Sequence, residues 1–217
     1  MKRAQTLEIR LERPEEYRAV EELTREAFWN VHVPGCNEHY LAHILRTHAD
    51  FLPTLNFVAY KDGLLVGNIM YTRAKVVLGD GAEHVMILFG PVSVLPQYQS
   101  QGVGSALIRH SLDEARRQGY KAVFLYGDPK YYCRFGFLPG EHYGIATEQG
   151  NFHPALQALE LETGALEGIS GRLFESAAYN INEADASAFD KTFPPKEKFV
   201  TESQREFARL AGLPVPE

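Results

Sequence analysis

The segment from residue 84 to residue 126 constrains the fold more than any other part of this chain. Residues 84–95 (HVMILFGPVSVL) and 121–126 (KAVFLY) are apolar runs typical of buried strands. Between them lies a glycine-containing loop, and residues 102–118 then repeat apolar side chains at helical spacing until Gly119 ends the helix. A strand, a helix and a second strand in this order predict a crossover with parallel pairing in the sheet. The chain is therefore expected to be of the α/β class.

A hairpin upstream of this unit predicts that the sheet mixes strand directions. Residues 55–60 and 64–78 have strand patterns and are joined by Lys61-Asp62-Gly63, and an Asp-Gly turn between apolar runs is a strong hairpin signal. Pro91 interrupts the strand at 84–95. Because proline has no N–H to donate to a ladder, we expect a bulge or a splayed edge at Gly90-Pro91.

We predict one domain that spans residues 1–217. A strand at 6–11, a helix opened by Pro14 and a helix at 37–48 precede the hairpin. Weaker patterns follow the crossover: strands at 156–161 and 171–176, a helix at 182–189, and an amphipathic helix at 201–211 that begins with a capping box. No linker is polar enough to separate a second domain, so residues 140–217 are expected to form a C-terminal elaboration.

Charge and composition narrow the function classes. The 22 lysines and arginines against 28 acidic residues give a net charge of −6, which disfavours nucleic acid as a partner and mildly favours a cationic substrate. The two cysteines are too few and too far apart for a disulfide framework or a metal quartet. No apolar run approaches the roughly 18 residues of a membrane span, and the start has no signal-peptide core. We expect a cytoplasmic protein without a metal or a membrane partner.

The loop before the predicted helix at 102–118 is the strongest candidate for a binding site. Its N–H groups and those of the first helical turn have no helical partner, and together with the helix dipole they can hold phosphate oxygens. No lysine follows Gly102 or Gly104, which excludes a Walker loop. The dinucleotide fingerprint would need a small residue where Leu107 stands. A generic nucleotide-binding domain is therefore the weakest alternative.

Two motifs about 30 residues apart carry a family resemblance. Gln99-Ser100-Gln101-Gly102-Val103-Gly104 resembles the acetyl-CoA loop Gln/Arg-x-x-Gly-x-Gly/Ala of the GNAT N-acetyltransferase superfamily. Residues 127–137 (GDPKYYCRFGF) resemble the tyrosine helix of the same superfamily, and YYxRFGF is similar to a bacterial group of predicted N-acetyltransferases. The resemblance covers about residues 7–139. It implies a mixed, mostly antiparallel central sheet flanked by helices.

The resemblance also implies an acetyl-CoA site. Residues 92–94 would pair with the pantetheine arm, the amides of 99–105 would hold the pyrophosphate, and Asp128 and Tyr131 would contact the rest of the cofactor. An asparagine is commoner in the family than Asp128, and Tyr131 is as well explained by packing as by contact. The residues implied for acetyl-CoA are Val92, Ser93, Val94, Gln99, Ser100, Gln101, Gly102, Val103, Gly104, Ser105, Asp128 and Tyr131.

Tyr132 matches the family tyrosine that protonates the departing CoA thiolate. The implied reaction is direct transfer of an acetyl group to a primary amine of a small molecule or peptide. The predicted strand at 84–95 has no carboxylate for a general base, so Glu26, Glu38 and His84 stay open alternatives, as does loss of the proton to water.

The acceptor pocket is expected between the loop at 29–38 and elements after the tyrosine helix, with Trp29, His32 and Tyr40 as lining candidates. His39 and His43 have the spacing of a metal pair, although a polar helix face explains them better. A catalytically idle acyl-CoA-binding module is the alternative function. The apolar faces in 140–217 predict that this region docks on the core, helps to wall the acceptor site and contributes to a homodimer, and a passive lid that only stabilises the fold is the equal alternative.

Overall fold

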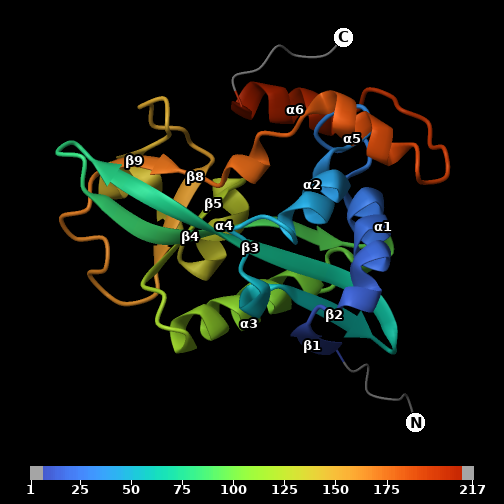
Figure 1. The fold of residues 1–217 in the computed structure, drawn as a ribbon, viewed down its shortest axis with the longest axis horizontal. Coiled ribbons are helices and arrows are strands. Elements are labelled where there is room, and N and C mark those ends of the chain that lie inside the picture. The colour runs from blue at the N-terminus through green and yellow to red at the C-terminus, as the bar shows by residue number, and fades with distance from the viewer. Residues whose placement is uncertain (1–6, 212–217) are drawn as a thin grey trace.

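The computed structural model describes residues 7–211, which form one sheet flanked by helices (Figure 1). The nine strands of the described chain run in the order β1-β2-β3-β4-β5-β8-β6, with β9 on β3 and β7 on β9. The strands are β1 (Leu7–Leu11), β2 (Phe57–Lys61), β3 (Leu64–Leu78), β4 (Glu83–Val94), β5 (Ala122–Tyr126), β6 (Leu138–Pro139), β7 (Ile145–Ala146), β8 (Leu156–Glu160) and β9 (Gly171–Phe174). The helices are α1 (Tyr17–Phe28), α2 (Glu38–Leu45), α3 (Val103–Arg117), α4 (Pro129–Tyr132), α5 (Glu183–Asp190) and α6 (Glu202–Ala211).

Strand directions are mixed and mostly antiparallel, as predicted. The crossover through α3 makes β4 and β5 parallel, and the only other parallel pair in residues 7–211 is β7 with β9. Only Ile87 and Leu88 of β4 pair with β5, although both strands continue beyond them. The sheet is therefore open between the C-terminal ends of these two strands.

The bulge predicted at Gly90-Pro91 lies where this opening begins. Ile69 of β3 pairs with Val92 and Tyr71 pairs with Phe89, so Gly90 and Pro91 face the single residue between them on β3. Two residues against one define a β-bulge, which bends its strand. The bulge thus turns β4 away from β5.

Helices cover both faces of the sheet, because side chains alternate along the strands. The apolar stripe of α3, which includes Leu107 and Ile108, packs on one face against Ile69, Ile87 and Val123. On the other face α2 packs near Met70, and Thr24 of α1 lies 3.2 Å from the Ser93 hydroxyl. Figure 1 shows α3 on one side of the sheet and α1 with α2 on the other.

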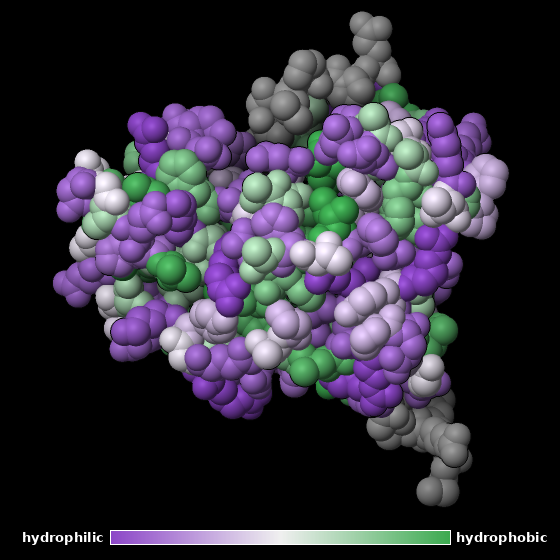
Figure 2. All heavy atoms as spheres, in the orientation of Figure 1, coloured by the Kyte–Doolittle hydropathy of each residue, from purple (hydrophilic) through white to green (hydrophobic). Residues whose placement is uncertain are grey.

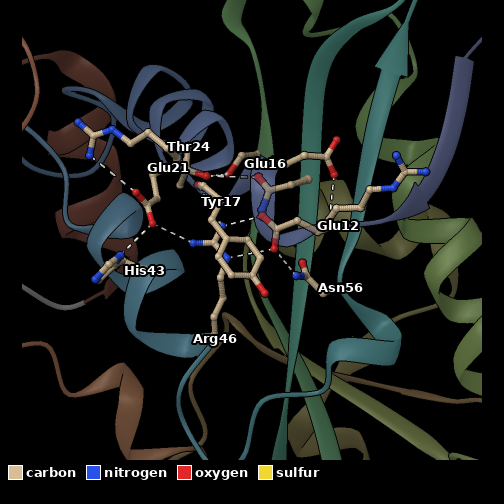
Figure 3. A network of polar contacts seen from close by, with 12 residues as sticks. Glu12, Glu16, Tyr17, Glu21, Thr24, His43, Arg46 and Asn56 are labelled. Atoms are coloured by element: carbon tan, nitrogen blue, oxygen red, sulfur yellow. Dashed lines mark hydrogen bonds and ion pairs between the residues drawn. The ribbon is translucent and has the colours of Figure 1, made fainter.

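A buried ionic cluster ties α1 and α2 to the edge of the sheet (Figure 3). Arg46 donates to Glu12 at 2.6 and 3.0 Å and to Glu21 at 3.0 Å. The Arg46, Glu12 and Glu21 side chains are only 3%, 0% and 6% exposed. His43 lies 2.9 Å from Glu21, and Asn56 donates to Glu12. The cluster fixes the two helices that form one wall of the site described below.

The C-terminal region extends the sheet and covers the connection between α1 and α2. Thr201 and Gln204 each donate to the Asn30 carbonyl, at 2.9 and 3.0 Å, and Ser203 donates to the Val31 carbonyl at 2.9 Å. Figure 1 shows α5 and α6 beside α2. The end of the chain therefore lies against the loop expected to border the acceptor pocket.

The expectation that His39 lies on a polar helix face is wrong. Its side chain is fully buried beneath α5, with Cys36 Sγ 3.4 Å from Nδ1 and Asp190 Oδ1 3.3 Å from Nε2. Burial lowers the pKa of His39 to about 4. The helix α5 lies far along the sequence, so the periodicity of α2 alone gave no sign of this cover.

Candidate active site

A cavity of about 830 Å³ occupies the opening between β4 and β5. One side is formed by the bulge of β4, residues 89–92, and the other by residues 126–128, which end β5 and lead into α4. The connection between α1 and α2, the loop before β8 and helix α6 complete the walls. Figure 2 shows apolar side chains gathered between α6 and the strands of the sheet.

Tyr132 lies at this cavity, held by rings on one side and by backbone on the other. Its ring centroid is 6.0 Å from those of Phe89 and Phe137 and 5.0 Å from that of Tyr131. A Cβ on Gly127 would collide with the Tyr132 ring, so the glycine is required for this approach. Burial raises the pKa of the Tyr132 hydroxyl. The phenol is therefore protonated at neutral pH and can act as a proton donor.

The short helix that carries Tyr132 begins in a defined way. Asp128 accepts a hydrogen bond from the Lys130 amide at 2.9 Å, and Pro129 occupies the first helical position. A capping carboxylate and a proline there both favour helix initiation. Asp128 thus has a structural role in the start of α4 while it also lines the cavity.

The glycine loop presents backbone rather than side chains. Gly102 has a φ of +85° at the N-cap of α3 and makes no side-chain cap. Its carbonyl accepts from Ala106, so the amides before Ala106 have no partner within the helix. Gln99 and Gln101 donate back to carbonyls of their own loop, at 3.1 and 2.7 Å. This arrangement suits an anion at the start of α3.

The residues predicted for acetyl-CoA fall into two groups. Val92, Asp128 and Tyr131 line the cavity, as does the predicted acid Tyr132, whereas Gln99 to Ser105 form the loop and the first turn of α3. The two groups meet at Gly104, where a Cβ would lie 3.5 Å from the Tyr131 hydroxyl. Val94 packs on the core, and the side chain of Ser93 points to α1.

Of the three residues expected to line the acceptor pocket, Trp29, His32 and Tyr40, only His32 lines the cavity. His32 is stacked on Phe207 of α6 at 4.5 Å. Trp29 does not line the cavity, because its indole donates to the Glu197 carbonyl at 2.8 Å and its ring packs on Arg25. Tyr40 packs on Phe189 of α5 instead. Both rings are covered by the segment at 183–199, which no pattern near them revealed.

Of the three base candidates, only Glu38 lines the cavity, and it lies 3.0 Å from His32 Nδ1. Glu26 binds Lys196 at 2.8 Å, and His84 is at the opposite end of β4 from the bulge. The sequence reasoning missed Glu175, which follows β9 and also lines the cavity. Burial, and next the charge of Glu148, raise the pKa of Glu175 to about 7.

A mixed sheet opened beside a helix N-terminus places the chain among acetyltransferase folds. Residues 8–140, more than half of the chain, match the family model of the acetyltransferase (GNAT) domain. The chain therefore belongs to the GNAT N-acetyltransferase superfamily.

Two uncharacterized N-acetyltransferases of Escherichia coli K12 are similar in sequence. YhbS is 30% identical over 164 residues, which cover 75% of this chain and 92% of YhbS. YjhQ is 39% identical over 87 residues, which cover 40% of this chain and 48% of YjhQ. The match to YjhQ thus spans about half of that protein.

Two solved structures with similar folds contain CoA or acetyl-CoA. The E. coli YhbS structure in complex with CoA has a TM-score of 0.73 and 27% identity, and covers 83% of this chain and 96% of its own. A GNAT acetyltransferase from Brucella melitensis in complex with acetyl-CoA has a TM-score of 0.65 and 29% identity, and covers 81% and 99%.

Residues 7–211 contain neither a candidate membrane span nor a candidate cluster of metal ligands. No helix in this range is long and apolar enough to cross a membrane. No three His, Cys, Asp or Glu side chains within it converge as metal ligands.

Proposed function

We propose that this protein binds acetyl-CoA and transfers its acetyl group directly to the primary amine of a small molecule or peptide. The observation that carries the proposal is the cavity between β4 and β5, which is lined by the bulge, Tyr131 and Tyr132, with the Tyr131 hydroxyl beside Gly104 at the start of α3. Acetyl-CoA and CoA complexes among similar structures support it. The backbone of residues 92–94 would pair with the pantetheine arm, and the amides of 99–105 would bind the pyrophosphate.

Tyr132 is the proposed acid in this transfer. The acceptor nitrogen attacks the thioester carbonyl carbon, the carbon–sulfur bond breaks, and the sulfur takes the proton of the Tyr132 hydroxyl. A phenol held among rings keeps this proton at neutral pH, because burial raises its pKa. General acid catalysis of this kind contributes roughly 10²–10⁴-fold to a rate.

Thiol release from acetyl-CoA in the presence of an amine panel tests the transfer. Tyr132→Phe should bind acetyl-CoA normally and lower kcat roughly 10²–10⁴-fold. Tyr120→Phe, outside the cavity, is the matched control. Binding of acetyl-CoA without thiol release for any amine would instead favour the idle acyl-CoA-binding module.

Calorimetry tests the cofactor site independently of turnover. Gly104→Glu should abolish acetyl-CoA binding, because a carboxylate at the first turn of α3 would repel the pyrophosphate. Gly79→Glu adds the same charge in a turn where a Cβ has open space, and should bind normally. Equal affinity for the two variants would contradict the site.

A further inference from the structure

The wall of the cavity combines negative charge with aromatic rings. Among the described residues that line the cavity, none is lysine or arginine. Four are carboxylates: Glu38, Asp128, Glu175 and Glu206. The ring-bearing side chains around them include Phe28, Phe89, Tyr126, Tyr132, Tyr179 and Phe207. Such a wall favours a cation with an apolar body and disfavours an anion.

Glu175 is fixed between two anchored neighbours. Phe174 before it is the last residue of β9 and pairs with Lys75 of β3. Ser176 after it is buried, accepts from the Ala178 amide at 3.3 Å and lies 3.1 Å from His48 Nδ1. The carboxylate therefore sits on backbone that both flanking residues hold in place.

The same segment is bonded to the bulge of β4. Tyr179 donates its hydroxyl to the Gly90 carbonyl at 2.9 Å. Tyr179 ends the short 3₁₀ turn Ala177–Tyr179, which begins two residues after Glu175. Glu175 is thus tied to the strand that would hold the acyl end of the cofactor in the proposed function.

Glu175 also differs from Glu38 and Asp128 in its partners. Within the described part of the chain, no residue forms a hydrogen bond or an ion pair with it. In contrast, Glu38 lies 3.0 Å from His32, and Asp128 caps α4. Glu175 lines the cavity, so it is enclosed by the surrounding walls and accessible to a ligand from within.

Glu148, from the loop after β7, is the charged neighbour that acts on Glu175. Burial first, and then the charge of Glu148, raise the pKa of Glu175 to about 7. Burial, and after it the charge of Glu175, raise the pKa of Tyr126 and Tyr179. Tyr132 and His153 line the same cavity. Among the described residues of the cavity lining, no lysine or arginine offers this carboxylate a cation.

We propose that Glu175 receives the ammonium group of the acceptor and takes its proton, and that the acceptor is a cationic amine with an aromatic or bulky apolar body and no carboxylate. This inference rests on the proposed function. It names the amine class and the base that the sequence left open.

The nitrogen of an ammonium acceptor loses two protons during the transfer. One N–H proton passes to a Glu175 oxygen, which frees the nitrogen lone pair to attack the thioester carbonyl carbon. When the carbon–sulfur bond breaks, the sulfur takes a proton from Tyr132. The second proton lost by the nitrogen restores the Tyr132 hydroxyl. Glu175 returns its proton to water, so the products are the amide, CoA thiol and one released proton.

Calorimetry on the CoA-saturated protein tests recognition with three probes. Phenethylamine should bind at least tenfold more tightly than either of the other two probes. Phenylalanine carries an additional carboxylate, and ethylamine lacks the ring. Glu175→Gln should weaken phenethylamine binding about tenfold. Glu148→Gln removes a neighbouring charge from outside the cavity lining and should retain the binding. Equal binding of phenethylamine and phenylalanine would overturn the inference, as would unchanged binding by Glu175→Gln.

The pH dependence of kcat/KM tests the proton transfer. A base must be deprotonated, and the raised pKa of Glu175 predicts that kcat/KM falls as the pH drops below about 7. Glu148→Gln should move this acid limb to lower pH, because the charge of Glu148 helps to raise the pKa. In Glu175→Gln this acid limb of the pH profile should disappear. Above pH 7, kcat/KM of this variant should be roughly 10²–10⁴-fold lower than that of the wild type.

The two proposals fail in different ways. If Glu175→Gln acetylates phenethylamine at the wild-type rate and with the wild-type pH profile, this inference is overturned. The proposed function stays intact in that case. No thiol release with any amine, despite binding of acetyl-CoA, would overturn the proposed transfer and with it the role of Glu175 as a base.

Discussion

Replacing Arg46 by methionine should destabilise the fold by about 3–5 kcal/mol, the range observed when one partner of a buried ion pair is removed. Three charge-assisted hydrogen bonds to Glu12 and Glu21 disappear, and the two carboxylates, only 0% and 6% exposed, lose their cation. The stacking of the guanidinium on Tyr17, 4.3 Å from the ring centroid, is lost as well. Methionine keeps much of the apolar stem of arginine, so the loss in free energy of unfolding measures mainly the removal of the charge.

Urea unfolding followed by circular dichroism measures this effect, with the m-value checking that both proteins unfold alike. Arg117→Met is the control, because Arg117 pairs with Glu114 on the exposed surface of α3 and should change stability by no more than about 0.5 kcal/mol. A loss equal to that of the control would refute the reasoning.

Three further outcomes follow from the structure. Gly127→Ala should displace the Tyr132 ring and lower kcat roughly 10²-fold, measured by thiol release, while acetyl-CoA affinity is retained. The pKa of His39 is lowered to about 4 in the fold, so the stability it contributes is complete above pH 6.5 and declines as the pH falls toward 4. Unfolding free energies should therefore drop by about 2 kcal/mol between pH 7 and pH 5, a slope that His39→Gln removes. Truncation after Phe199 deletes the α6 wall and should change amine preference in a competition assay, and light scattering will show whether the predicted homodimer depends on the same segment.

The elements of this fold were predictable because their signals are local. The crossover from β4 through α3 to β5, the Asp-Gly hairpin and the bulge at Gly90-Pro91 all follow from residues close in sequence. The glycine loop and Tyr132 were found for the same reason, since each belongs to a short motif. The backbone of the loop also agrees with its glycine content, because Gly102 adopts a positive φ, which glycine tolerates best.

Surroundings built from distant segments could not be predicted in this way. Trp29 and Tyr40 have the composition of pocket residues, yet the segment at 183–199 covers them. His39 has the spacing of a surface helix residue, yet Asp190 and Phe193 of the far C-terminal region enclose it. Periodicity reports which face of an element is apolar and gives no information on which later segment will cover it.

The sequence by itself predicted the crossover from β4 through α3 to β5, the Asp-Gly hairpin and the interruption at Gly90-Pro91, because side-chain periodicity and turn chemistry are properties of short segments. Two motifs that resemble the GNAT superfamily pointed to the glycine loop and to Tyr132. The opening between β4 and β5 is a property of the fold. Tertiary structure alone decided which carboxylate faces that opening. Glu175 stands more than forty residues beyond Tyr132 with nothing distinctive around it in sequence, and only the pairing of β9 with β3 and the bond from Tyr179 to Gly90 carry it to the cavity. The environment that shifts a carboxyl group, its burial and its neighbouring charges, exists only after the chain has folded.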